Sequence, residues 1–126
     1  MEHLIMEKQN EPMAENDTDA LNAEADRLLS VHEFGKFKGR ERYYGTACRV
    51  ILAGLLEIHA EASNPVTESV ATARKFARDR QGLVAFLSKG TGWLVGLAVY
   101  RLGVYTTEED YPVVMDTILR QVAVPA

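Results

Sequence analysis

The stretch RERYYGTACRVILAGLLEIHAEA, residues 40–62, decides the fold. Its apolar residues recur every three or four positions, as they do on one face of a helix. This stripe consists of Tyr44, Ala47, Cys48, Ile51, Leu55, Ile58 and Ala62. A second apolar side consists of Val50, Leu52, Ala53 and Leu56. Because a helix that is apolar on most of its sides is surrounded by neighbours, the sequence predicts a helix over 40–62 at the centre of the domain.

The chain N-terminal to this stretch divides into a polar part and an amphipathic part. With 126 residues, the chain has the length of one domain. We expect residues 1–15 to form a disordered acidic tail and residues 16–126 to form a single all-α domain. Asp17 or Thr18 can cap the first helix, whose apolar face extends as far as His32.

After the central stretch, the sequence Ser-Asn-Pro predicts a stop and a restart. Asn64 is a good N-cap, and Pro65 suits a first helical turn, where its missing N–H costs nothing. The pattern predicts a helix over 65–80. Gly82 can kink or split this helix before Gly90 ends it as a left-handed C-cap.

Residues 91–104 are apolar enough for a buried strand or a helix. No second strand signal lies nearby, and a lone strand has no partner for its backbone groups, so the pattern favours a helix capped by Thr91. Gly92 and Gly96 indicate close helix–helix packing, either within one subunit or between two.

The last segment opens with TTEED, residues 106–110, a double capping-box pattern. Pro112 then marks either the start of the main helix or a kink in it. Together these segments predict an all-α fold, a compact bundle of about five helices.

Composition and charge indicate a soluble, cytoplasmic protein. Cys48 is the single cysteine, so no internal disulfide is expected, and neither a signal peptide nor a membrane span is apparent in the sequence. Acidic ends flank a mildly basic middle over residues 28–104. Such asymmetry is typical of electrostatic docking surfaces and of self-complementary subunits.

The sequence predicts no catalytic residue, no metal site and no cofactor. Cys48 and His59 lie eleven positions apart on one helix, about 16 Å at a rise of about 1.5 Å per residue, too far for a nucleophile and its base. We interpret Cys48 as a small buried hydrophobic side chain and His59 as a packed or rim histidine. Glu57 and Glu61 share a face without a zinc or di-iron spacing, and we interpret them as a solvated face.

A glycine-hinged loop over residues 34–44 alternates bases with aromatics, a composition that can bind phosphates or pack against a protein. Its candidate partner-binding residues are Phe34, Lys36, Phe37, Lys38, Arg40, Arg42 and Tyr43. A secondary basic face consists of Arg74, Lys75 and Arg78 on the predicted 65–80 helix. The alternative interpretations are a solvated linker for the loop and a solvated helix face for the second cluster.

These features favour a small, non-enzymatic, protein-binding helical module that acts as an adaptor, regulator or inhibitor of another protein and forms a homodimer. The reason is a surplus of apolar and aromatic surface in a small domain. The alternative is a nucleic-acid-binding regulator that uses the loop over 34–44 and the helix over 65–80, although the sequence pI of about 5.4 is low for such proteins. A more remote alternative is an enzyme whose site is assembled between subunits. No membrane partner is expected.

Overall fold

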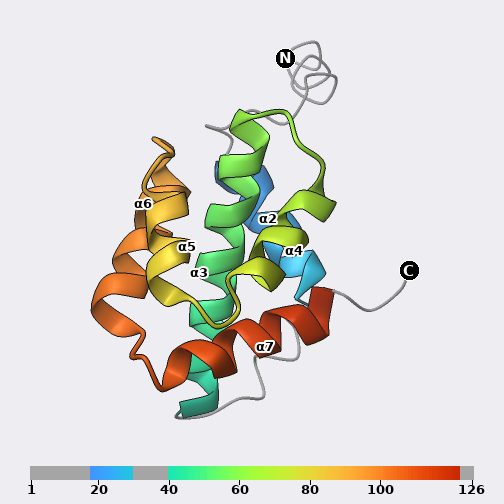
Figure 1. Ribbon diagram of the computed structural model, residues 1–126. Helices are drawn as coiled ribbons and strands as arrows, with labels where there is room; N and C mark the ends of the chain where they lie inside the picture. The colour runs from blue at the N-terminus through green and yellow to red at the C-terminus, as the bar shows by residue number, and fades with distance from the viewer. Residues whose placement is uncertain (1–17, 30–39, 123–126) are drawn as a thin grey trace.

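The computed structural model describes residues 18–29 and 40–122, and over these ranges the chain is all-α, as predicted (Figure 1). The described elements are α2 (Thr18–Leu28), α3 (Arg40–Glu61), α4 (Val66–Lys75), α5 (Arg80–Leu87), α6 (Trp93–Tyr100), the π-helical turn η2 (Arg101–Tyr105) and α7 (Asp110–Val122). The predicted tail over residues 1–15 lies outside the described residues, and so does the end of the first predicted helix at His32. No helix in the described ranges is both long enough and apolar enough to cross a membrane.

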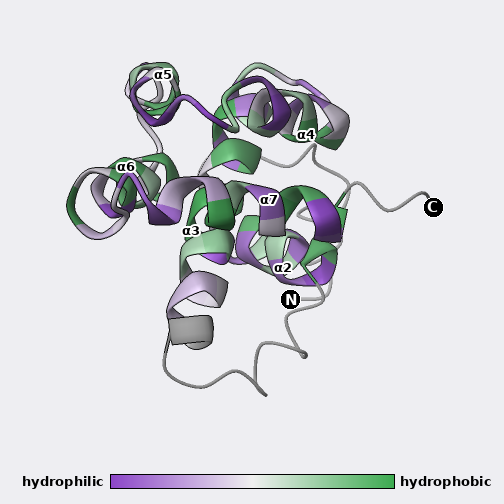
Figure 2. Ribbon diagram, turned by 60° about the horizontal axis from the view of Figure 1, so that its bottom comes forward, coloured by the Kyte–Doolittle hydropathy of each residue, from purple (hydrophilic) through white to green (hydrophobic). Residues whose placement is uncertain are grey.

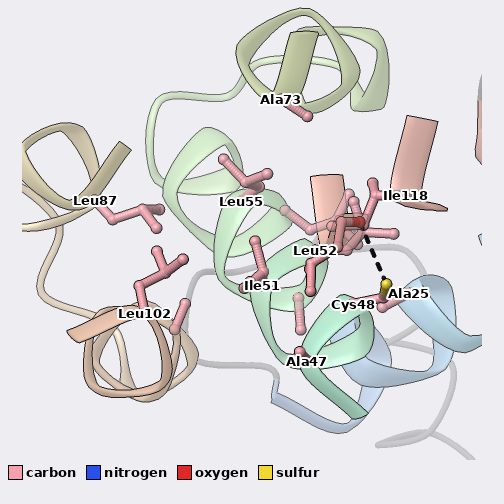
Figure 3. Packing of buried hydrophobic residues seen from close by; sticks show 14 of the residues in the cluster. Ala25, Ala47, Cys48, Ile51, Leu52, Leu55, Ala73, Leu87, Leu102 and Ile118 are labelled. Atoms are coloured by element: carbon pink, nitrogen blue, oxygen red, sulfur yellow. Dashed lines mark hydrogen bonds between the residues drawn. The ribbon is translucent and has the colours of Figure 1, made fainter. Parts of the chain in front are cut away.

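The central position of α3 is confirmed. α2, α4, α6 and α7 all pack against it, and α5 and α6 lie together on one side of it in both Figure 1 and Figure 2. Every residue from Ile51 to Glu57 is buried, so neighbours enclose this part of the helix on all sides. In Figure 3, Leu87, Leu102 and Ile118 approach α3 from different surrounding helices.

The predicted helix over 65–80 is wrong in its extent, because the chain breaks between α4 and α5. Asp79 is the N-cap of α5, and its carboxylate accepts the Gly82 N–H at 2.9 Å. A Cβ on Gly82 would lie 2.2 Å from an Asp79 oxygen, so the glycine makes room for this cap. The N-cap of α4 is Pro65 rather than Asn64.

The helical interpretation of 91–104 is confirmed, but its packing differs from the prediction. The close approach to α3 is made by Gly54, where an added Cβ would lie 2.5 Å from the Ala98 Cβ. Gly96 is exposed, and an added Cβ there would meet nothing within 4 Å. Gly96 therefore lies on the side of α6 away from α3, where it brings no pair of described helices together.

The last helix, α7, begins at Asp110, whose N–H donates to the Thr107 hydroxyl at 3.1 Å. This bond is one half of the predicted capping-box pattern. Pro112 is the third residue of α7. In the first turn a helix does not use the N–H that proline lacks, so the helix can begin before it.

Candidate functional site

Exposed apolar side chains gather on one side of α6 and η2. Trp93 is 70% exposed, Val104 60% and Tyr100 55%, and Leu97 and Tyr105 are also exposed. We call these five residues the aromatic face. No large apolar side chain in the described part of the chain is more exposed than Trp93.

The aromatic face exists because α6 is apolar all round while only one of its sides is covered. Leu94, Val95 and Ala98 are buried, and Leu102 continues this buried side into η2. None of the eight residues of α6 is charged. A helix with this composition is normally enclosed by other parts of a protein. The uncovered side of α6 is therefore a candidate interaction surface.

The π-helical turn extends the aromatic face by one ring. The Thr106 N–H donates to the Arg101 carbonyl at 3.0 Å, the five-residue spacing of a π-helix. This wider turn brings Tyr105 beside Tyr100, with ring centroids 5.5 Å apart and an angle of 71° between the ring planes. Such edge-to-face pairs are a favourable aromatic geometry.

Tyr43 and Arg101 form one edge of the aromatic face. The Arg101 guanidinium lies 5.2 Å from the Tyr43 ring centroid and 5.4 Å from the Tyr105 ring centroid. The Tyr43 hydroxyl donates to the Tyr105 carbonyl oxygen. The structure therefore places Tyr43, one of the predicted partner-binding residues, beside an exposed surface that sequence reasoning did not identify.

The other residues of that predicted set are not brought together by any described contact. Phe34, Lys36, Phe37 and Lys38 lie outside the described residues. Arg40 and Arg42 belong to the first turn of α3. The binding role of the loop over 34–44 stays a prediction.

A cleft of about 250 Å³ borders the other edge of the aromatic face, between α2, α3 and α6. Trp93 and Leu97 line it together with Asn22 and Arg49. The Arg49 Nε lies 2.7 Å from a carboxylate oxygen of Asp26. The aromatic face is therefore continuous with a hollow that has both apolar and polar walls.

The secondary basic face is divided by the break after α4. Arg74 and Lys75 end α4 and are exposed. Arg78 lies in the linker and makes two hydrogen bonds, of 2.9 and 3.0 Å, to the two carboxylate oxygens of Asp116 on α7. This bidentate pair engages the Arg78 guanidinium, so the three cations do not form one uniform basic surface.

The interpretation of Glu57 and Glu61 as a solvated face is wrong, because both carboxylates bind the N-terminus of α6. Glu57 is fully buried and accepts the Val95 N–H at 2.9 Å. Glu61 accepts the Gly92 N–H at 3.1 Å. A helix N-terminus favours negative charge. These carboxylates of α3 thus take the capping role predicted for Thr91.

The glycine at position 92 is the feature of the sequence that is consistent with a carboxylate at the N-terminus of α6. A Cβ at Gly92 would lie 2.0 Å from a Glu57 carboxylate oxygen, so only glycine leaves space for the buried carboxylate. The predicted close approach of helix backbones at Gly92 is wrong, because the group that lies against Gly92 is the Glu57 carboxylate. By fixing the start of α6, Glu57 and Glu61 also fix the position of Trp93, the first residue of that helix.

Cys48 is a buried side chain, as predicted, and His59 takes the packed rather than the rim position of the two that the sequence left open. The His59 ring is hydrogen-bonded through Nε2 to the Thr72 hydroxyl at 2.8 Å and through Nδ1 to the Asn64 amide at 3.0 Å. Cys48 is buried beside Val114, and burial raises the pKa of its thiol to about 12. In the described ranges, no three His, Cys, Asp or Glu side chains are grouped so as to hold a metal ion.

Burial of His59 predicts a loss of stability at mildly acidic pH. Desolvation lowers the pKa of His59 below its ordinary value, with the Glu68 charge acting weakly in the opposite direction. The unfolded chain therefore binds this proton more readily than the native protein does. The free energy of unfolding should fall as the pH is lowered from about 7 to about 5. Urea titrations at several pH values should show a shallower fall for a His59→Gln variant, and an equal fall in both proteins would contradict the prediction.

The chain matches no protein-family model, no curated protein and no solved structure. Its own residues are therefore the basis for a functional proposal. Among these, the aromatic face is the feature that the packing of the described helices leaves unexplained.

Proposed function

We propose that the protein is a small, non-enzymatic helical module that binds protein helices through the aromatic face and self-associates. The observation that carries this proposal is the exposure of Trp93, Tyr100 and Val104 on one side of α6 and η2. No described part of the chain covers this side. Since a fully exposed aromatic side chain presents about 150–250 Å², the whole face amounts to about 500 Å², a size that on monomers is often functional.

The chemistry of the aromatic face supports a protein partner. Tryptophan, tyrosine and arginine are the residue types that most often dominate the energy of protein interfaces. Between Trp93 and Tyr105 the only charged residue is Arg101. Nucleic-acid binding depends on several lysine or arginine contacts to phosphates, and this face does not provide them.

The spacing of the exposed residues supports a helix as the structure of the partner. Trp93, Leu97, Tyr100 and Val104 lie at positions i, i+4, i+7 and i+11. This is the spacing with which one helix presents anchors to another helix or to a groove. The bound segment is therefore expected to be an amphipathic helix with its apolar side on the aromatic face.

Site-specific photo-crosslinking tests the proposal. A benzophenone amino acid is placed at Leu97, and a matched control carries it at Val113 on α7, since the two residues are 38% and 43% exposed. Irradiation in cells of the source organism, and of the purified protein, should give discrete protein adducts from position 97 that position 113 does not give. Adding Trp93→Ala and Tyr100→Ala should remove these adducts.

The partner is then identified by mass spectrometry and purified, so that the interaction is measured directly. Trp93→Ala should weaken its binding by about tenfold or more, because removal of a central aromatic anchor has effects of this size. Val113→Ala should leave it unchanged. If position 97 gives no adduct beyond those of position 113, either with another protein or with a second copy of the chain, the proposed function is wrong.

A further inference from the structure

The α6–η2 segment, which carries the aromatic face, contains a seven-residue repeat of an aromatic residue followed three positions later by glycine. Trp93 and Gly96 form the first unit, and Tyr100 and Gly103 form the second. All four residues are exposed, and a Cβ added to either glycine would meet nothing within 4 Å. Neither glycine is therefore required by the packing of the described chain. A seven-residue repeat along a helix is typical of a seam against a second helix.

We propose that the aromatic face binds the same face of a second copy of the chain, with the two α6–η2 segments antiparallel and the twofold axis at the level of residue 98. In this register Trp93 of one copy lies opposite Gly103 of the other. Tyr100 lies opposite Gly96 in the same way. Each large ring fills a notch where the partner has no side chain. This inference rests on the proposed function and names the partner of the face.

A parallel arrangement lacks this complementarity. In a parallel pair, Trp93 would face Trp93 of the second chain and Tyr100 would face Tyr100. The glycines would likewise face glycines. Such a seam leaves voids at the glycines and crowding at the aromatics, and both are unfavourable. The order of aromatic residues and glycines along the segment therefore specifies the relative direction of the two helices as well as their register.

The charges at the two ends of the segment agree with the antiparallel direction. Lys89 precedes α6, Glu109 follows η2, and both side chains are exposed. Antiparallel pairing brings the basic end of one copy toward the acidic end of the other. Opposite charges at the rim of an interface favour encounter and register.

The area of the face indicates a dimer of modest strength. With about 500 Å² from each copy, the interface would bury about 1,000 Å², near the lower limit for specific interfaces. Because an interface of this size binds weakly, association should be measured by sedimentation velocity of the full chain at concentrations of about 1–500 µM. The expected result is a reversible monomer–dimer equilibrium.

Filling the notches tests the register without damaging the fold. In the variant with Gly96→Ala and Gly103→Ala, the added methyl groups have open space in the monomer, and alanine favours helix more than glycine does. The monomer should unfold at the same temperature or higher, while its association weakens by about tenfold or more, since overpacked interfaces are unfavourable. Val113→Ala on α7 should change neither quantity. A dimer with undiminished affinity in the glycine variant would overturn the proposal.

Single-cysteine variants test the direction. In the antiparallel register the two Leu97 positions are two residues apart along the seam, about 3 Å, whereas the two Val104 positions are twelve residues apart, about 18 Å. A disulfide requires Cα atoms within about 7 Å. Leu97→Cys should therefore form a covalent dimer on mild oxidation and Val104→Cys should not, while buried Cys48 stays unreactive in both. Efficient cross-linking of Val104→Cys indicates a parallel pair and overturns the proposal.

The outcomes separate this inference from the proposed function. A chain that stays monomeric at every concentration overturns the dimer, and with it the self-association within the proposed function, but not the binding of other protein helices. If position 97 still forms an adduct with a different protein that depends on Trp93, the face binds protein helices but its partner is not a second copy. If it forms no specific adduct, both the inference and the proposed function fail.

Discussion

Replacing Leu55 by Ala should lower the free energy of unfolding by about 2–5 kcal/mol, the range for a leucine removed from an enclosed core. Leu55 is fully buried, and the residues on both sides of it in α3 are buried as well. Helices on several sides hold their positions around α3, so the cavity left by the missing atoms cannot close completely. Urea titration followed by circular dichroism measures the loss.

Val113→Ala is the control for this experiment. Val113 is 43% exposed on α7, and its truncation should change the free energy of unfolding by less than about 0.5 kcal/mol. The native spectrum of both variants should be that of a largely helical protein. A loss below about 1 kcal/mol for Leu55→Ala would mean that α3 is not enclosed, because fully buried leucines cost more than this.

Replacing Glu57 by Ala should lower the free energy of unfolding by about 2–3 kcal/mol, the cost of leaving a buried donor without its charged acceptor. The carboxylate accepts the Val95 N–H at 2.9 Å in a fully buried position at the start of α6. Glu57→Gln keeps an acceptor oxygen and most of the volume but loses the charge that the helix N-terminus favours. Its cost should be smaller, about 1 kcal/mol.

Glu61→Ala is the matched control, because Glu61 caps the same helix from a half-buried position. It should cost about 0.5–1 kcal/mol, as for an ordinary capping residue. Trp93 is the first residue of α6, so its fluorescence reports loosening of this helix start independently of global unfolding. Equal losses for Glu57→Ala and Glu61→Ala would contradict the structural role assigned to the buried carboxylate.

Periodicity made α3 predictable. Its apolar residues occupy two sides of the helix, and the only arrangement that removes both from water is a central one. The same periodicity places Cys48 in the packed interior, where it is fully buried. It does not decide the position of His59, which lies in neither apolar stripe and is buried by its contacts with other parts of the chain.

The break between α4 and α5 was harder to predict because two local signals compete. The apolar spacing continues past Phe76, which favours one long helix, while Asp79 can cap a new one. In the structure Asp79 caps a new helix, α5, and the absence of a side chain at Gly82 leaves space for the Asp79 carboxylate. The sequence allows a kink or split at Gly82, whereas the helix breaks earlier, between Lys75 and Arg80.

The aromatic face lay beyond the reach of the sequence alone. Residues 93–100 are apolar on every side, so periodicity identifies a helix but does not distinguish the covered side from the open one. The covered side is determined by the residues of α3 that pack against α6. Gly54 leaves space for the Ala98 side chain, and Glu57 binds the first turn of α6. The hydrophobic pattern is a local property that the sequence determined by itself. The exposure of each side of α6 depends instead on which helices, distant in the sequence, pack against it. Only the tertiary structure decided that Trp93 and Tyr100 face outward.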